Sequence, residues 1–271
     1  MAESSLLRRR GLKALQGHWQ TALLITFGAG IFDTALRVFQ IRVNLPSMAG
    51  SDLLSILGAF QRQDNSFLWI YYILFFLGFV FTSALGIGLN NYFLCLHRGQ
   101  ATGFFLLFSR MRIFGKCLGQ ALLIALLILL WSLILIPGAY LIALARVTSM
   151  VVVTVLVILL IIPSIVAGFR YAMAPYLLAD NPDIGVISSI RNSREIMKGN
   201  KGRLFWLDIS FVGWFLLSVL IAGVLAVISP VLGTVAGLFT SLALQVYVNS
   251  ATAAFYLDLT SHTPQPEEEM Q

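Results

Sequence analysis

An acidic residue inside an apolar stretch is the feature of this sequence that could support chemistry. Asp208 lies a few residues into a stretch, beginning after Arg203, that is long enough to span a membrane. A carboxylate in a spanning segment costs about 2.5–3.5 kcal/mol at the membrane centre and less near an interface. We therefore expect Asp208 to face protein and to pair with one of four polar residues: Arg170, Arg203, Lys201 or Asn91. Two roles stay open, a structural ion pair or a site for a proton, an ion or a lipid headgroup.

Polar side chains in the other apolar stretches offer a second kind of site. Asn90 and Asn91 follow Gly86 and Gly88, and an amide among packed helices requires a hydrogen-bond partner. We interpret the two asparagines either as contacts that bind helices together or as the lining of a polar cavity. A transport function would use the polar residues within or near the apolar stretches: Asp33, Asn90, Asn91, Asp208, Gln245 and Asn249.

A basic cluster precedes and enters the stretch that contains Asp208. Its members are Arg191, Arg194, Lys198, Lys201 and Arg203. Cations near a membrane surface attract anionic lipid by roughly 1 kcal/mol each. The cluster therefore predicts contacts with anionic lipid headgroups.

Motifs of known enzyme classes are missing from the sequence. It contains no G-x-S-x-G, no P-loop and no H-E-x-x-H. Its three histidines share no metal-ligand spacing, and Cys95 and Cys117 cannot build a disulfide framework. We expect no enzymatic activity, no metal site and no cofactor.

The composition indicates a membrane protein. Hydrophobic residues make up 58% of the 271 residues and charged residues only 11%, whereas about a quarter of an average soluble domain is charged. The net charge of +6 comes from basic residues spread over short loops, a pattern typical of membrane orientation and not of nucleic-acid binding.

We expect an all-α polytopic fold with six spans in three hairpins, joined by short amphipathic helices at the cytoplasmic interface. The spans are predicted at residues 19–39, 67–96, 117–140, 150–171, 204–228 and 231–257. Residues 1–258 would form a single membrane domain, and the acidic tail 259–271 would be disordered. Gly233 and Gly237 predict a close helix contact in the last hairpin.

The basic residues predict the orientation. Fourteen of the 18 lysines and arginines fall on one side of the predicted spans, so both termini should be cytoplasmic. The same sorting indicates a unit that occurs three times: a basic amphipathic helix, a glycine, an outgoing span and a returning span. The predicted helices cover residues 4–16, 102–115 and 180–198, and end at Gly17, Gly115 and Gly199.

Several stretches resemble a known family. They are ALQGHWQTALLI at 14–25, LLWSLILIPG at 129–138, FRYAMAPYLLADNP at 169–182, residues 193–217 and AAFYLDL at 253–259. They resemble the bacterial integral membrane family filed as domain of unknown function 975. Residues 145–169 depart from that pattern and resemble instead a related membrane domain fused to some glycerophosphodiester phosphodiesterases. The resemblance implies a six-helix fold in a bacterial inner membrane and no particular activity.

Together these patterns predict a non-enzymatic module that organises lipid or protein in the bacterial inner membrane. Its expected partners are membrane lipids, above all anionic ones, and no nucleic acid, with a homo-oligomer or another membrane protein as alternatives. The competing hypothesis is a small-solute or ion transporter or channel that uses Asp208. A lipid-modifying enzyme would need two convergent titratable groups, which the sequence does not pair.

Overall fold

The computed structural model describes residues 2–44, 65–100, 103–133, 137, 162 and 165–262, with side chains between Ser4 and Ile31 and from Tyr72 onward. Within these ranges the protein is all-α, with eight α-helices and two short 3₁₀ helices. The elements are α1 (Ala2–Leu15), α2 (Trp19–Asn44), α4 (Asn65–His97), η2 (Phe104–Phe108), η3 (Met111–Ile113), α5 (Phe114–Ser132), α8 (Ala174–Asp180), α9 (Val186–Ile196), α10 (Lys201–Ile228) and α11 (Pro230–His262).

Four described helical runs are long and apolar enough to cross a membrane. They are Tyr72–His97, Phe104–Trp131, Lys201–Ile228 and Pro230–Ser261. A shorter apolar helix covers Trp19–Ile31. Most of the side chains in these runs lie on the surface of the protein, as expected where lipid covers them. The runs indicate a multi-pass membrane protein and confirm the all-α class. The number of six spans stays a prediction, because most of the span expected at 150–171 lies outside the described residues.

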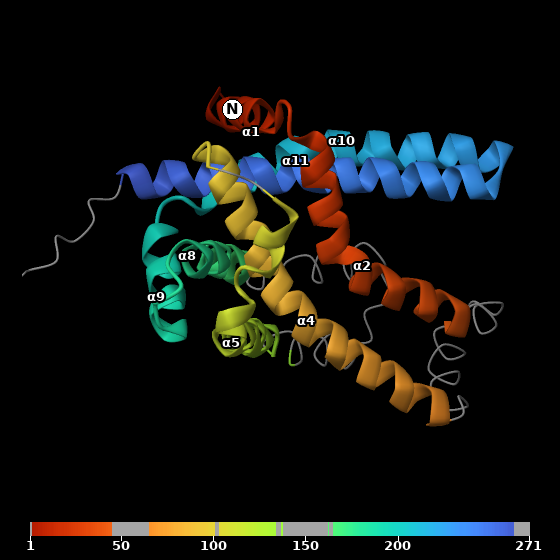
Figure 1. Ribbon diagram of the computed structural model, residues 1–271, viewed down its shortest axis with the longest axis horizontal. Coiled ribbons are helices and arrows are strands. Elements are labelled where there is room, and N and C mark those ends of the chain that lie inside the picture. The colour runs from red at the N-terminus through yellow and green to blue at the C-terminus, as the bar shows by residue number, and fades with distance from the viewer. Residues whose placement is uncertain are drawn as a thin grey trace, which may run out of the picture.

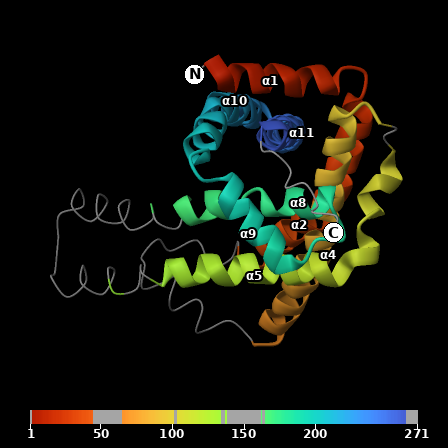
Figure 2. The same cartoon turned by 90° about the vertical axis from the view of Figure 1, so that its left-hand side faces the viewer.

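The helical pairs extend in different directions from a common region (Figures 1 and 2). α10 and α11 form a long antiparallel pair, and α2 packs along α4. The turn of the α10–α11 hairpin is the single residue Ser229. A Cβ on Gly233 would collide with the Cβ of Ala226, and Ser218 Oγ donates to Thr240 Oγ1 at 2.6 Å. The predicted close contact at Gly233 is therefore confirmed.

The N-terminal helix packs on α11. A Cβ on Gly11 would lie 3.1 Å from the backbone nitrogen of Ala251, which is a tight contact, so glycine favours this close approach of the two backbones. Leu7 and Leu15 are buried beneath α1, whereas Leu6 and Leu12 are exposed. α1 thus has one face on protein and another that is exposed.

Two of the three predicted glycine joints are confirmed. Gly17 (φ 80°) and Gly199 (φ 78°) adopt the left-handed conformation that glycine favours, directly before α2 and α10. The third prediction, Gly115, is wrong because that residue lies inside α5. The corresponding left-handed residue is Gly99 (φ 67°), just after the end of α4.

The amphipathic helices predicted at 102–115 and 180–198 also differ from the structure. The first is replaced by η2 and η3, because side chains and backbone of this segment bind to α4 instead of continuing one regular helix. The second begins later than predicted. Asp180 ends α8 instead of capping a new helix, and α9 starts only at Val186.

Candidate functional site

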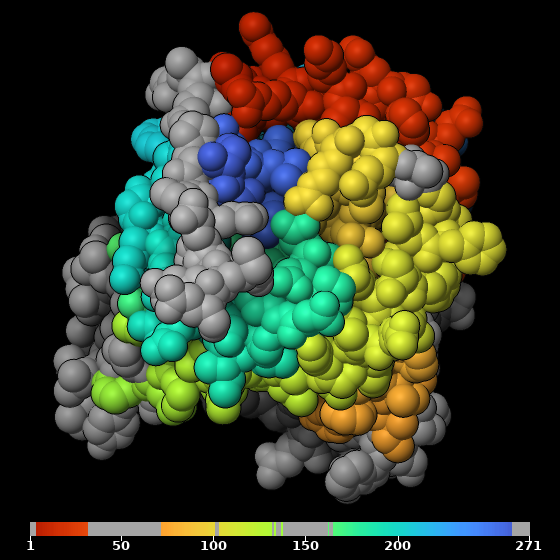
Figure 3. All heavy atoms as spheres, turned by 60° about the vertical axis from the view of Figure 1, so that its left-hand side comes forward, coloured from red at the N-terminus to blue at the C-terminus, as the bar shows by residue number. Residues whose placement is uncertain are grey.

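Charged side chains gather where the ends of α1, α4, α8, α10 and α11 meet. Figure 3 shows the N-terminal helix and the ends of α4, α8 and α11 on one face of the molecule. We call this cluster the polar junction, and its members are Arg10, Arg98, Asp180, Arg203, Tyr256 and Asp258.

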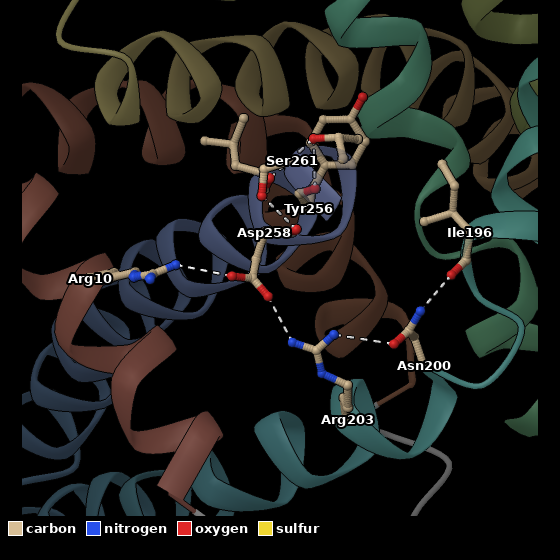
Figure 4. A network of polar contacts seen from close by, with 9 residues as sticks. Arg10, Ile196, Asn200, Arg203, Tyr256, Asp258 and Ser261 are labelled. Atoms are coloured by element: carbon tan, nitrogen blue, oxygen red, sulfur yellow. Dashed lines mark hydrogen bonds and ion pairs between the residues drawn. The ribbon is translucent and has the colours of Figure 1, made fainter. Parts of the chain in front are cut away.

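Asp258 lies at the centre of one half of the polar junction (Figure 4). Its Oδ1 accepts from Arg10 Nη1 at 3.1 Å, and its Oδ2 accepts from Arg203 Nη2 at 2.7 Å. Arg203 also donates to Asn200 Oδ1 at 3.2 Å and lies over the Phe255 ring, 5.6 Å from its centroid. The carboxylate therefore joins α1, α10 and α11 by bonds between oppositely charged groups, which are the stronger class of hydrogen bond.

Asp180 forms the other half of the polar junction. Its Oδ1 accepts from Arg98 Nη1 at 2.6 Å, and its Oδ2 accepts from the Tyr256 hydroxyl at 3.1 Å. The hydrogen bond to Asp180 raises the pKa of Arg98 above its ordinary value. Tyr256 stacks on Tyr176, whose buried position raises the pKa of its phenol. Asp180 thereby ties the end of α4 to α8 and α11.

A further hydrogen-bonded group lies beside these ion pairs. His97 Nε2 is 2.9 Å from the Ser250 carbonyl oxygen, and since a carbonyl can only accept, Nε2 is the donor. Ser250 Oγ donates to the Gly11 carbonyl at 3.0 Å, so the group links α4, α11 and α1. A small open pocket of about 190 Å³ lies next to it. The pocket is lined by Arg10, His97, Ala254, Leu257, Asp258 and Ser261.

Asn91 is engaged away from Asp208. Its Oδ1 accepts from Arg110 Nη2 at 3.0 Å, and its Nδ2 donates to Ser109 Oγ at 3.1 Å. The same Arg110 atom donates to the Ala179 carbonyl at 2.6 Å. Asn91 is therefore a buried contact between helices, and Asn90 is half-buried beside it with no described hydrogen bond.

Asp208 differs from the expectation. Its side chain is exposed on the flank of the buried stripe of α10, and it makes no hydrogen bond or ion pair within the described part of the chain. Arg203 bonds instead to Asp258, and the Arg170 carbonyl accepts from Ser193 Oγ at 3.1 Å. The physical reason shown by the structure is that Asp258 binds the guanidinium group of Arg203. Of the other polar residues, Gln245 is exposed, Asn249 is half-buried, and Asp33 lies outside the described side chains.

The basic cluster divides into two groups. Arg191, Arg194 and Lys198 are exposed and make no hydrogen bond or ion pair within the described ranges, and Lys201 is half-exposed and equally unpaired there. Arg203 is bonded to Asp258, so its charge is used inside the protein. A lipid contact is therefore less favoured for Arg203, whose charge is already paired. It stays a prediction for the other four cations, which are not paired in the described ranges.

The arrangement can bind helices together and attract anions. No group of three histidine, cysteine or acidic side chains that could hold a metal occurs among the residues searched, which are the described ones. Sequence reasoning missed the role of Asp258. The available signal was that AAFYLDL, like the Asp208 stretch, places one acid in an apolar helix.

Comparison with known proteins identifies the family of the chain. No curated protein and no solved structure matches the chain. The model of a family described as "Protein of unknown function (DUF975)" matches residues 1–263, nearly the whole chain. The chain therefore belongs to the DUF975 family.

Proposed function

We propose that this protein is a non-enzymatic module of a bacterial inner membrane that binds anionic lipid and so organises lipid or protein around it. The observation that carries the proposal is the contrast within the basic cluster. Arg203 is neutralised by Asp258, whereas Arg191, Arg194 and Lys198 are exposed and unpaired within the described ranges. Exposed cations beside membrane-spanning helices suit the phosphate groups of anionic lipids.

The geometry of α9 supports this proposal. Arg191 and Arg194 are three residues apart on α9, so they share one side of the helix, and Lys198 follows two residues after its end. The opposite side is fixed to the protein. Ser193 Oγ bonds to the Arg170 carbonyl, and Gln120 Nε2 bonds to Ser189 Oγ at 2.6 Å. The cations are therefore presented outward from a rigidly attached helix.

Lipid retention tests the proposal. The protein would be purified in native nanodiscs and its retained lipids measured by mass spectrometry, for the natural chain and for Arg191→Gln/Arg194→Gln/Lys198→Gln. Loss of three surface cations at roughly 1 kcal/mol each weakens binding by up to about a hundredfold, so retained anionic lipid should fall sharply.

A matched control lies on the same helix. Glu195 is exposed and carries the opposite charge, so Glu195→Gln should not reduce anionic lipid. Equal retention by the natural chain and the triple variant would contradict the proposal. Copurification of a specific protein or a second copy, unchanged by the triple variant, would favour protein organisation instead.

Transport is the second candidate, and Asp208 favours it. An exposed carboxylate in a membrane-spanning helix with no described partner is costly, which is typical of functional positions. Proteoliposomes would be tested for proton or ion flux with the natural chain and with Asp208→Asn. A flux that the substitution abolishes would support transport, and its absence would leave the lipid-binding proposal as the better account.

The proposal includes an orientation with both termini in the cytoplasm, based on the basic residues. We also propose that the protein is related to the membrane domains of some glycerophosphodiester phosphodiesterases. Residues 145–169 suggest this relation. Labelling of single cysteines from each side of the membrane would test the orientation.

A further inference from the structure

The segment between α4 and α5 lies beside the helices that precede it. A Cβ on Gly88 of α4 would collide with the carbonyl oxygen of Leu107. A Cβ on Gly28 of α2 would lie 3.4 Å from a ring carbon of Phe104. η2 therefore sits against two glycines, one on each helix of the α2–α4 pair.

These contacts place η2 well away from the helix ends. Gly88 precedes His97, the last residue of α4, by nine residues, and Gly28 follows Trp19, the first residue of α2, by nine. At about 1.5 Å per residue, both separations correspond to roughly 13 Å along the helix axis. Both contacts thus lie at the same distance from the ends of their helices, and α4, with 33 residues, is longer than a hydrocarbon core about 30 Å thick requires.

The chain then returns toward the helix ends. Ser109 and Arg110 bond to Asn91, which is closer to the end of α4 than Gly88. Further along, Lys116 Nζ donates to the Pro182 carbonyl at 2.9 Å, just beyond the end of α8. The segment thus enters beside α4 and comes back before α5 continues.

The backbone of this segment suits an apolar environment, where each unsatisfied polar group is costly. Leu106 N donates to the Gly103 carbonyl at 3.0 Å, Ser109 N to the Leu106 carbonyl at 3.1 Å, and Ile113 N to the Arg110 carbonyl at 3.1 Å. The 3₁₀ turns therefore satisfy these backbone groups within the segment itself.

The exposed side chains of η2 are apolar. Leu107 is 1% exposed against α4, whereas Phe105 is 86% exposed, with Phe104 and Phe108 exposed beside it. Their surface adjoins the exposed apolar side chains of α2, such as Phe27. Lipid is the occupant that this continuity favours, because α4 is long and apolar enough to cross a membrane and Trp19–Ile31 of α2 is apolar as well.

We propose that residues 103–113 form a re-entrant loop that dips into one leaflet of the membrane beside α2 and α4, with Phe105 at its tip in contact with lipid acyl chains. The loop accounts for the apparent length of the apolar run Phe104–Trp131, since its first residues lie alongside α4 instead of extending α5. The proposal does not depend on lipid binding by α9.

Spin-label accessibility tests the loop. Phe105→Cys, in a full-length chain with Cys95 and Cys117 replaced, would carry a nitroxide in lipid nanodiscs. Collisions with oxygen, which enters lipid, would be compared with collisions with a water-soluble nickel chelate. Leu24→Cys, exposed on α2, is the lipid reference, and Lys13→Cys, exposed on α1, is the aqueous reference.

We expect the label at position 105 to collide more often with oxygen than with the nickel chelate, as the label at position 24 does. The label at position 13 should collide more often with the nickel chelate. A ratio matching position 13 would overturn the loop, because the tip would then lie in water. Low collision rates with both reagents would overturn lipid as the occupant and indicate a protein cover, such as a second copy. Adding Gly88→Ala, which obstructs Leu107, should move the label at 105 toward the aqueous ratio.

Discussion

Asp208 and Asp258 are both carboxylates in long apolar helices, but only one is neutralised by described neighbours. Asp258 accepts from two arginines and its side chain is 15% exposed, whereas Asp208 is exposed and has no described partner. Residue type and local sequence are alike at the two positions, so the difference is tertiary. We infer that Asp258 stabilises the fold, and Asp208 remains the acid that the transport hypothesis would use.

A matched pair of substitutions separates these roles. Asp258→Asn removes the charge that Arg10 and Arg203 share, and hydrogen bonds to charged groups contribute about 1.5–3 kcal/mol, so the unfolding free energy should fall by about 2 kcal/mol. Asp208→Asn removes an exposed charge from an apolar helix and should leave stability equal or higher. Thermal unfolding in one detergent measures both, and equal losses would contradict the inference.

The arginine partners explain why only part of the site could be predicted. An acid in an apolar run is visible locally, so Asp208 was found from the sequence. The partner of Asp258 at Arg203 is 55 residues away and the partner at Arg10 is 248 residues away. No spacing rule connects such positions, and Arg203 was therefore grouped with the lipid-facing cations.

Close contacts between elements depend on glycines at particular places. Gly233 and Gly88 each face an atom that would collide with a Cβ, and Gly17, Gly99 and Gly199 adopt positive φ angles. The joints at Gly17 and Gly199 were predictable because a basic helix ends there in the sequence. The joint at Gly99 was not, because binding of residues 104–110 to α4 replaced the regular helix expected there.

The α10–α11 hairpin gives an internal comparison of two glycines. Gly233→Ala places a methyl group against Ala226 and should cost about 1–3 kcal/mol by overpacking. Gly223→Ala, in the facing helix, meets no atom within 4 Å and should stabilise by roughly 0.5–1 kcal/mol through helix propensity. Unfolding temperatures of the two variants should shift in opposite directions. Shifts of the same sign would show that the hairpin does not pack as described.

A second comparison tests the corrected joint. Gly99 has a φ of 67°, so Gly99→Ala should cost about 1 kcal/mol, because a Cβ is disfavoured there. Gly115 lies inside α5 with nothing within 4 Å of an added Cβ, so Gly115→Ala should be neutral or stabilising. Chemical unfolding of the two purified variants measures the difference. The opposite order would restore Gly115 as the break in the chain.

At the scale of the whole molecule, the ion pairs of the described residues gather in the polar junction, and most side chains of the long apolar runs are exposed. The side chains of α10 are mostly exposed, and its main neighbours are α11 and α1. Composition and apolar length were enough to predict an all-α membrane protein. The contacts between the helices could not be predicted. They depend on single residues, such as Gly11 and Asp180, that follow no periodic pattern in the sequence.

The docking of α1 on α11 is the contact that joins the beginning and the end of the chain. Gly11 permits the close approach, Arg8 Nη1 donates to the Ser210 carbonyl at 3.3 Å, and Arg10 bonds to Asp258. Gly11→Leu should therefore release α1 while α10 and α11 remain paired through Gly233 and the bond between Ser218 and Thr240.

Hydrogen exchange in nanodiscs measures this release by segment. In Gly11→Leu, amide protection should fall in α1 and around Asp258 but stay unchanged near the turn at Ser229, where the hairpin holds itself together. Lys13→Leu is the control, since it adds a similar side chain to the exposed side of α1 and should leave protection in place. If amide protection fell over the whole of α10 and α11, the hairpin would need α1 for its stability. That result would contradict the view that α1 docks on a hairpin that is already stable.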